Sequence, residues 1–473
     1  MNEDKLPAGW CDVKLSDVAT HHSGDSKLIK GKLSSERQAG MHPAYSATGQ
    51  DVWREAFEQE GSAIIISAVG ARCGKCFKAD GKWSAIANTH IVWPIEEVAD
   101  RDFLWFKLNN ERFWVRGGSA QPFVKTKESF RHEFGLPPLA EQQRIVEKIE
   151  TLFAELDKGE EALREVQKLL ARYRQSVLKA AVTGTLTADW RAANSQLKEN
   201  GEDLLTRILE ERRTTWQGRG KCKEPVEPVA EGLPELPEGW VWASVEQLAT
   251  VIGGLTKNKK RGEMPMKRPM LRVANVYQDR LELDDVHESG VTEGELDRVT
   301  LRKGDMLVVE GNGSKDQIGR MAVWNGEIPD AVHQNHLIKV RMIDPDVVAF
   351  AMKWFQSPEG RQNIELVASS TSGLYTLSIS KIERLAVPLP SKDELNEICD
   401  RLDEAFARMA PVHDWCEAEL NRSAALRQSI LKDAFSGKLV PQDRSDEPAE
   451  KLLDRIRASR EEKPKAKPKK PKA

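Results

Sequence analysis

The sequence lacks a hydrophobic run long enough to cross a membrane. Its longest apolar stretch, Ala63–Ala71, is far shorter than the about 20 residues that a spanning helix needs. The amino-terminal segment MNEDKLPAGW has no apolar stretch after its charges, so it does not have the form of a secretory signal. We therefore expect a cytoplasmic protein without a membrane segment.

Clustered cysteines and an excess of charge of one sign are also missing. The six cysteines are scattered along the chain, as is usual in a reducing compartment. Lys and Arg total 71 against 74 Asp and Glu, for a formal net charge of −3. Six of the lysines lie in the last segment, KPKAKPKKPKA, so any basic binding surface elsewhere must be local.

Signatures of catalysis and of metal binding are absent as well. There is no G-x-x-x-x-G-K-[ST] loop for nucleotide phosphates and no Asn-Pro-Pro-Tyr-like segment to hold a flipped base. The pair Cys73 and Cys76 supplies only two of the four ligands that structural zinc requires. His333 and His336 have the spacing of a metal edge, but a polar turn before a strand is the simpler interpretation. The sequence predicts no catalytic residue and no metal in this chain.

What the sequence does contain is an internal duplication. Short motifs recur in the same order at separations of 230 to 253 residues. The matched pairs are Leu6–Trp10 with Leu236–Trp240, Gly74–Phe77 with Gly319–Ala322, Asn88–Val92 with Asn335–Ile338, Arg174–Lys179 with Arg427–Lys432, Gly184 with Gly437, and Leu204–Ile208 with Leu452–Ile456. Two helices of similar composition would not produce this ordered series, so we expect two copies of one structural plan.

Each copy begins with a mixed segment of short strands. The runs GSAIIISAVG and GDMLVVEGNG are apolar strands that end at glycine turns, and hairpin turns are predicted at Asp80-Gly81 and Asn325-Gly326. Helices are expected near Phe103–Phe113 and Val347–Gln356. The proline pair Pro137-Pro138, or its neighbourhood in the second copy, then introduces a long helix.

The expected fold class is α+β, internally duplicated, with two mixed α/β domains and two long coiled-coil helices. The predicted boundaries are 1–135 for the first mixed domain, 136–190 for the first long helix, 191–235 for a short helix and linker, 236–388 for the second mixed domain, 389–440 for the second long helix, 441–462 for a short helix and 463–473 for a basic disordered tail.

The long helices carry the spacing of a coiled coil. Apolar residues alternate at intervals of four and three, with breaks at Gly159 in the first copy and at Glu419 and Ser423 in the second. About 40 residues make a helix of roughly 60 Å, whose apolar seam needs a partner. The two copies are expected to pack on each other; the alternative is that each packs on its own globular segment. The predicted seam residues are Ile145, Ile149, Leu152, Leu156, Leu163, Val166, Leu170, Ile398, Leu402, Met409, Leu426 and Ile430.

The clearest electrostatic feature is the run Lys257–Arg272, which contains seven basic residues and one acid. Lys and Arg along an irregular loop can follow a DNA backbone, although a solvated loop is the alternative. The amides of Gln334 and Asn335 have the chemistry to pair with adenine edges. The residues predicted to contact DNA are Lys27, Lys30, Lys32, Arg72, Lys75, Asn88 and His90 in the first copy and Lys257, Lys259, Lys260, Arg261, Asn312, Ser314, Lys315, Gln334, Asn335 and His336 in the second.

Taken together, these motifs resemble those of the specificity subunits of type I restriction–modification systems. The resemblance covers nearly the whole chain. The second copy departs from it at the entrance to its long helix, where Lys392–Leu395 stands in place of the first copy's Ala-Glu-Gln-Gln. The segments that carry it are the Leu-Pro-x-Gly-Trp start of each copy, Leu136–Ile145, Arg174–Lys179 with Gly184, and Glu310–Ser314 with His333–His336.

The resemblance implies two target-recognition domains that each read one half of an asymmetric, bipartite DNA site. Two long antiparallel helices would separate them and bind two modification subunits, which carry S-adenosylmethionine and methylate adenine. Restriction subunits would add translocation and cleavage driven by ATP with magnesium. The chain itself would hold no cofactor, and its partners would be double-stranded DNA and these subunits.

Two other functions compete with this one, and an enzyme that transfers methyl groups as an isolated chain is the last alternative. A stand-alone DNA-binding or regulatory protein would bind its site tightly without enzyme partners. An interaction scaffold would use the coiled coil alone, and the DNA affinity of its complexes would not fall with salt.

Overall fold

The computed structural model of the chain describes residues 6–118, 120–196, 199–216, 221–312, 314, 317–371 and 374–461. Unit 1 comprises Met1–Arg164 with Glu417–Ala473, and unit 2 comprises Glu165–Cys416. Both boundaries fall inside the long helices, so the compact units do not follow the sequence repeat. None of the helices in the described ranges has the length and hydropathy of a membrane span.

Unit 1 is built around a four-stranded antiparallel sheet with the order β2-β9-β6-β7. The central strand β6 (Ala63–Ser67) is buried along its whole length, because its β-branched side chains pack on both faces. A second sheet has the order β4-β3-β8-β5. The strands are β1 Cys11–Lys14, β2 Ala19–Ser23, β3 His42–Ser46, β4 Gly49–Arg54, β5 Gln59–Glu60, β6, β7 Cys76–Ala79, β8 Lys82–Ala85, β9 Thr89–Pro94, β10 Arg116–Gly117, β11 Phe123–Val124 and β12 Glu133–Leu136. The short helices are α1 Leu15–Val18, η1 Lys30–Lys32, α2 Arg101–Leu108, η2 Glu111–Phe113, α3 Thr126–Ser129 and α13 Ala449–Glu461.

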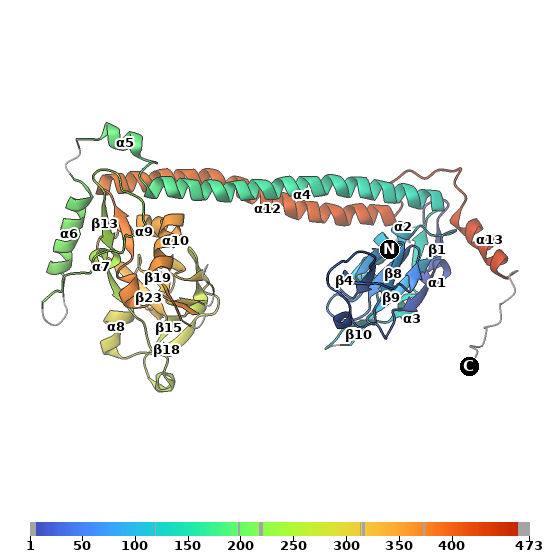
Figure 1. The fold of residues 1–473 in the computed structure, drawn as a ribbon, viewed down its shortest axis with the longest axis horizontal. Helices are drawn as coiled ribbons and strands as arrows, with labels where there is room; N and C mark the ends of the chain where they lie inside the picture. Colours follow the sequence, from blue (N-terminus) through green and yellow to red (C-terminus); the bar gives the residue numbers. More distant parts are fainter. Residues whose placement is uncertain are drawn as a thin grey trace. The chain divides into compact units, whose positions relative to one another are not determined.

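Unit 2 has a four-stranded antiparallel sheet with the order β14-β23-β19-β21 and a second sheet, β18-β15-β22. Helix α6 runs along one side of this unit against α7 and β26 (Figure 1). The strands are β13 Val241–Ser244, β14 Ala249–Ile252, β15 Lys267–Leu271, β16 Val276–Tyr277, β17 Arg280–Leu281, β18 His287–Gly290, β19 Met306–Val309, β20 Gly311–Asn312, β21 Met321–Val323, β22 Val332–His333, β23 Leu337–Met342, β24 Ser369–Thr371, β25 Leu374–Thr376 and β26 Ala386–Leu389. The helices are α5 Ala188–Ala193, α6 Gly201–Thr214, α7 Val245–Leu248, η3 Lys259–Glu263, η4 Val273–Asn275, α8 Glu293–Val299, α9 Val347–Gln356, α10 Pro358–Val367 and α11 Ile379–Ile382.

The two units repeat the same topology. In each unit the main sheet joins four strands in the same relative order, and a parallel pair, β3 with β8 or β15 with β22, anchors the second sheet. In each, the first strand pairs with the strand that precedes the long helix, β1 with β12 and β13 with β26. The α+β fold and its internal duplication, predicted from the sequence, are confirmed.

The two predicted hairpins are wrong. Turns do occur at Asp80-Gly81 and Asn325-Gly326, where both glycines have a positive φ. The strands on either side of each turn, however, belong to different sheets: β7 pairs with β6, whereas β8 pairs with β3 and β5. Likewise β21 pairs with β19, and β22 with β15. Each turn passes the chain from one sheet to the other.

Two helices of 44 residues each, α4 (Leu139–Val182) and α12 (Lys392–Phe435), pair with each other. Within unit 1, Glu160 of α4 contacts Ser423 of α12, and Arg144 reaches Asp446 beyond the end of α12. Because numbering falls on one helix as it rises on the other, the pair is antiparallel. Within unit 2 the same direction follows from Arg174, which lies 4.1 Å from the Phe406 ring, and from Asp189, which pairs with Arg401.

The seam of the helix pair is partly polar. Ile145, Ile149, Ile398 and Leu402 are fully buried. Leu426, predicted as a seam residue, is 46% exposed, and that prediction is wrong. The following residue, Arg427, faces α4 instead, and the buried Ser423 donates its hydroxyl to Glu160 at 2.7 Å. The remaining predicted seam residues are Leu152, Leu156, Leu163, Val166, Leu170 and Met409, which are half-buried, and Ile430, which is 7% exposed.

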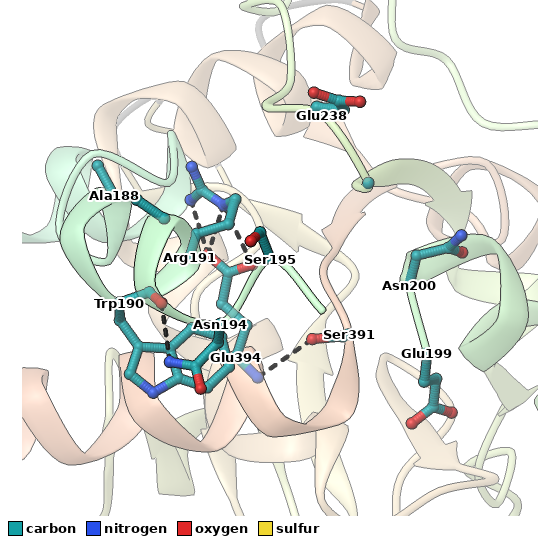
Figure 2. A pocket seen from close by; sticks show the side chains of 12 residues that line it. Ala188, Trp190, Arg191, Asn194, Ser195, Glu199, Asn200, Glu238, Ser391 and Glu394 are labelled. Carbon is teal, nitrogen blue, oxygen red and sulfur yellow. Dashed lines mark hydrogen bonds and ion pairs between the residues drawn. The ribbon is translucent and has the colours of Figure 1, made fainter. Parts of the chain in front are cut away.

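A buried carboxylate joins the start of each long helix to the tryptophan that opens each copy. In unit 2, Trp240 Nε1 donates to Glu394 Oε2 at 2.9 Å. Arg191 Nη2 donates to Glu394 Oε1 at 2.7 Å (Figure 2). In unit 1, Trp10 Nε1 donates to Glu141 Oε1 at 3.1 Å. Glu394 thus occupies the place of Glu141, although the sequence around it departs from the first copy.

The end of each long helix also closes on this motif. Gly184 follows α4 with φ +69°, and a Cβ there would lie 2.5 Å from Pro237 in unit 2. Gly437 follows α12 with φ +70°, and a Cβ there would lie 2.3 Å from Pro7 in unit 1. Each unit is therefore completed by the helix end that belongs to the other sequence copy.

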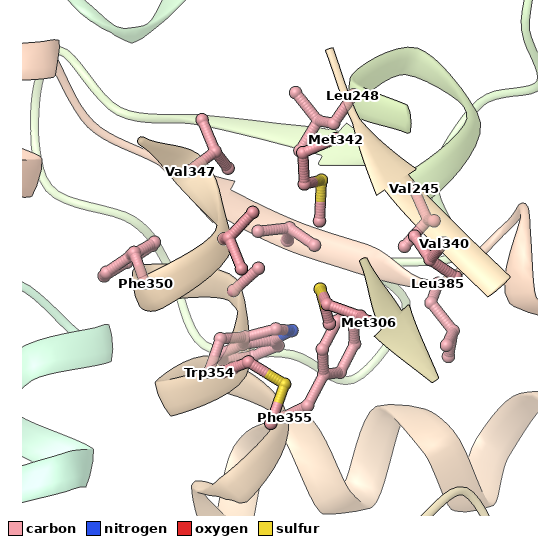
Figure 3. Close-up of a cluster of buried hydrophobic side chains, with 14 of the residues drawn as sticks. Val245, Leu248, Met306, Val340, Met342, Val347, Phe350, Trp354, Phe355 and Leu385 are labelled. Carbon is pink, nitrogen blue, oxygen red and sulfur yellow. The ribbon is translucent and has the colours of Figure 1, made fainter. Parts of the chain in front are cut away.

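The core of unit 2 lies between its main sheet and the helices α9 and α10. Figure 3 shows Met306 and Val340 of the sheet facing Trp354 and Phe355 of α9. Trp354 is fully buried, and its Nε1 donates to Ala386 O at 2.6 Å, which satisfies the indole N–H inside the core.

Candidate nucleic-acid interface

The polar turn Gln334–His336 in unit 2 is held by backbone hydrogen bonds from two directions. Gln334 N donates to Leu271 O and Asn335 N to Leu255 O, both at 2.9 Å. Leu255 N in turn donates to His333 O at 2.7 Å. These bonds join backbone atoms only, so they fix the turn whatever side chains it carries. A sequence-reading element needs such a backbone, because its side chains must differ between DNA targets.

A polar cavity of about 330 Å³ opens beside this turn. Its lining combines four basic side chains with the Gln334 amide and one acid, Glu288. The basic residues are Lys257, Arg261, Lys267 and Arg272. Such a mixture of cations and an amide suits phosphate contacts together with base-edge hydrogen bonds.

Two of these cations are anchored by the protein itself. Arg261 Nη2 pairs with Glu295 at 2.7 Å, its Nη1 donates to Gly290 O, and its side chain is only 14% exposed. Arg272 Nη2 pairs with Asp285 at 2.7 Å. Arg261 therefore supports the loop rather than facing solvent, contrary to its predicted role as an open DNA contact.

The lysines of the basic run are exposed. Lys257 lines the cavity. Lys259 and Lys260 lie in η3, whose start is capped by Asn258 Oδ1, which accepts from Lys260 N at 3.0 Å. Lys267 is exposed on β15. The residues predicted from the sequence did not include Lys267 and Arg272, although both belong to the same basic run; Lys267 begins β15 and Arg272 follows it.

Other predicted residues of the second copy are more scattered. His336 Nδ1 lies 2.8 Å from Glu310 Oε2 on the exposed side of the turn, whereas the Asn335 Oδ1 atom is buried without a partner among the described residues. The backbone of Asn312 forms part of β20, and Ser314 is exposed. Lys315 lies outside the described residues.

In unit 1 the predicted residues surround the equivalent strand, β9. Arg72 and Lys75 are exposed on the loop between β6 and β7, and Asn88 is exposed just before β9. Lys27 and Lys32 are exposed, but the Lys30 ammonium is paired with Asp51 and Thr48. Lys30 is thus less available for phosphate than its two neighbours.

His90 lies in β9 with its Nδ1 atom buried and without a partner among the described residues. Burial, assisted by the nearby His21, lowers the pKa of His90. The ring therefore stays neutral near pH 7, so a hydrogen bond to a base edge is chemically better suited to it than a contact with phosphate.

The CxxC and His-x-x-His spacings do not build a metal cluster. Across the described ranges, no three His, Cys, Asp or Glu side chains gather in a metal-binding arrangement. Cys73 and Cys76 are both buried beside Trp114 and are not bonded to each other. His333 is buried and bonded to Leu337 O at 2.6 Å through Nδ1, which fixes Nδ1 as the protonated nitrogen.

This burial makes His333 a source of acid sensitivity. Desolvation lowers its pKa to about 4 from the ordinary value of 6.5. Between those values the unfolded chain binds a proton that the folded chain does not, so stability falls as pH falls. We expect acidification from pH 7 to 5 to cost about 2 kcal/mol through this residue.

Thermal unfolding of the full chain and of His333→Asn at pH 7 and pH 5 measures this contribution. The variant should lose less stability on acidification than the wild type. Parallel losses in the two proteins would show that the acid sensitivity arises elsewhere.

Comparison with known proteins places these features in a family context. Residues 7–165 match the family model described as type I restriction modification DNA specificity domain. The EcoKI specificity subunit of Escherichia coli strain K12 is 29% identical over 342 residues, which cover 69% of this chain and 63% of that protein. The EcoDI specificity subunit of Escherichia coli is 24% identical over 490 residues, which cover 97% of both chains.

A solved structure supports the fold. A chain from "Structural basis underlying complex assembly and conformational transition of the type I R-M system" superposes with a TM-score of 0.58 at 18% identity, over 92% of this chain and 99% of that one. The resemblance first seen in the sequence motifs is confirmed by these matches.

Proposed function

We propose that this protein is the DNA sequence-recognition subunit of a type I restriction–modification complex. The proposal rests on the match of residues 7–165 to a type I specificity domain and on the similarity of nearly the whole chain to a type I specificity subunit. It reads an asymmetric, bipartite DNA site. It directs partner subunits that methylate adenine or cleave DNA.

One observation carries the bipartite site. The two units share their strand order and their tryptophan–glutamate contact, yet their loops present different side chains around the equivalent strands. Asn88 and His90 stand in unit 1 where the second copy has Gln334, Asn335 and His336. Two similar scaffolds with unequal reading surfaces suit two unlike half-sites.

The chain acts without catalytic residues of its own in this proposal. S-adenosylmethionine belongs to two modification subunits, and ATP and magnesium belong to restriction subunits. The relatives are named specificity subunits, and the absence of phosphate-loop and base-flipping motifs from the sequence supports the same division of labour. Its six free cysteines support a cytoplasmic setting.

Genome-wide mapping of methylated adenines, with and without this gene in the host, tests the proposal. Deletion should abolish methylation at one asymmetric, bipartite motif and leave other motifs intact. An unchanged methylation map in a host with active modification subunits would contradict the proposed function.

The side chains beside the cavity should separate into two kinds of contact. Lys259→Ala removes one exposed cation, so affinity should fall by a similar factor for all DNA sequences, with a salt slope lower by about one. Gln334→Ala removes an amide at the cavity wall, so discrimination at one base position should fall by about 1–3 kcal/mol. Competition binding of the assembled complex to single-base variants of the site at two salt concentrations distinguishes them. A uniform loss from both variants would contradict the assignment.

A further inference from the structure

Unit 2 contains a hairpin that the first copy lacks. Strands β3 and β15 correspond, because each pairs antiparallel with the next strand of its sheet and parallel with a later one. Residues 47 and 48 join β3 to β4, whereas residues 272–286 join β15 to β18. The longer connection forms the hairpin β16–β17, in which Tyr277 pairs with Arg280.

The tip of this hairpin and the last turns of α4 border a cavity of about 340 Å³, which we call the Arg320 cavity. Its lining contains three arginines, four glutamines and a single acid, Asp279, at the hairpin tip. The arginines are Arg174, Arg320 and Arg361. Arg174 Nη2 lies 3.8 Å from Asp279 Oδ2. The one carboxylate of the lining thus faces three guanidinium charges.

Arg320 is held in place, but its charge is not neutralised. Its Nη2 donates to Val273 O at 3.1 Å, and its guanidinium lies 5.4 Å from the centre of the Tyr277 ring. Its Nε atom is buried without a partner among the described residues. The corresponding residue of the first copy, Lys75, is exposed. A buried guanidinium N–H needs an acceptor, and a charged acceptor gives it the stronger bond.

A second buried donor lines the same cavity. Gln356 ends α9, and its Nε2 atom is also buried without a partner in the described ranges. Arg361 of α10 is fixed by its Nη1, which donates to Ile318 O at 2.6 Å. Two buried N–H groups that lack acceptors, beside three guanidiniums, suit an anion that has several oxygens.

We propose that the Arg320 cavity binds a small molecule through a terminal phosphate group. The phosphate oxygens accept from Arg320 Nε and Gln356 Nε2, and the phosphate charge balances the guanidiniums that Asp279 does not. A terminal phosphate suits this role because it presents three strong acceptor oxygens. The inference goes beyond the proposed function, since it gives the chain a ligand other than DNA and the partner subunits.

Two features favour a small ligand over the DNA backbone. The cavity lies at the α4 end of unit 2, whereas the candidate nucleic-acid interface lies beside β18 at the opposite end of this unit (Figure 1). A backbone phosphate is also esterified to a sugar on either side, so a duplex presents it to a surface rather than to two buried donors. The cavity volume falls within the range of about 300–1,000 Å³ that is usual for small-molecule sites.

Isothermal titration calorimetry of the purified full chain with AMP tests the assignment, with adenosine as the matched ligand that lacks the phosphate. AMP should bind about tenfold or more tightly than adenosine, and inorganic phosphate should displace it. Arg320→Gln should weaken AMP binding by about tenfold to a hundredfold, because it removes a charged donor. The matched control is Arg280→Gln, which removes a guanidinium that lies 4.9 Å from the same Tyr277 ring but outside the cavity lining. It should bind AMP as the wild type does.

Gln356→Leu provides a second variant that separates binding from folding. Leucine in place of an unpaired buried amide should leave the thermal stability of the chain unchanged or raised, while the affinity for AMP falls by about threefold to tenfold.

The absence of AMP binding to the wild-type chain, or equal affinity for AMP and adenosine, would overturn the inference. An equal loss of affinity in Arg280→Gln, or unchanged affinity in both Arg320→Gln and Gln356→Leu, would do the same. Displacement of AMP by a duplex that lacks the recognition site would overturn it by assigning the cavity to the DNA backbone. Methylation mapping tests the proposed function separately, so either proposal can fail alone.

Discussion

Replacement of Glu394 by alanine is expected to lower the local stability of unit 2 by about 3 kcal/mol or more, because breaking a buried ion pair leaves a charge without its partner. The Glu394 side chain is 4% exposed and accepts hydrogen bonds from Trp240, Thr187 and Arg191. Without Glu394, the Arg191 guanidinium would lie against the Trp240 ring with no carboxylate to neutralise it. The start of α12 would also lose its hydrogen bond to Trp240, which directly precedes β13.

Hydrogen exchange followed by mass spectrometry measures this effect in the full chain without assuming a single unfolding transition. The peptides that contain Val241–Ser244 and the first turns of α12 should exchange faster in Glu394→Ala, by a factor of about a hundred. The matched control is Glu141→Ala in unit 1, whose partners Trp10 and Gln442 are neutral. That variant should cost about 1–3 kcal/mol. Equal effects of the two variants would show that the Arg191 charge contributes nothing.

The spacing between the two DNA half-sites should follow the length of the helix pair. One heptad inserted into both α4 and α12, at positions opposite each other, adds about 10 Å to each helix while keeping the seam in phase. At about 3.4 Å per base pair, the preferred spacer should grow by about three base pairs, and methylation of the original site should be largely lost.

A library of DNA sites with varied spacers, methylated by the assembled complex and sequenced, reports the preferred length. A seven-residue replacement that keeps the helix length and the seam serves as the control and should retain the original spacer. An unchanged spacer in the insertion variant would contradict the idea that the helix pair sets the distance.

The long helices could be predicted from the sequence because their apolar period is local information. The repeat could be predicted equally well, since Arg174–Lys179 and Arg427–Lys432 have nearly the same residues and lie at equivalent positions of the two long helices. The apolar period predicted Leu426 as a seam residue wrongly. It identifies apolar residues only, whereas the seam at this position consists of Ser423, Arg427 and Glu160. That choice depends on a carboxylate on the other helix, more than two hundred residues away.

Strand pairing and the details of the candidate nucleic-acid interface were harder to predict from the sequence. The Asp80-Gly81 turn has the residues of a hairpin, but the neighbouring strands satisfy their hydrogen bonds in two different sheets. The basic run was visible as charge, whereas the burial of Arg261 beside Glu295 depends on α8, which lies further along the chain. Charge in a sequence therefore located the surface but did not distinguish its anchored cations from its exposed ones.

The way unit 1 is completed has a consequence for the order of events during synthesis. Its core includes Ile430, Ala434, Ala449 and Leu453, which leave the ribosome long after Phe103 and Ile145 of the same core. At ordinary elongation rates the amino-terminal domain waits on the order of tens of seconds for these residues, with apolar surface uncovered. Unit 2 has no such delay, because Glu165–Cys416 is one continuous stretch. The nascent chain is thus expected to complete unit 2 before unit 1, and to need chaperone protection mainly for unit 1.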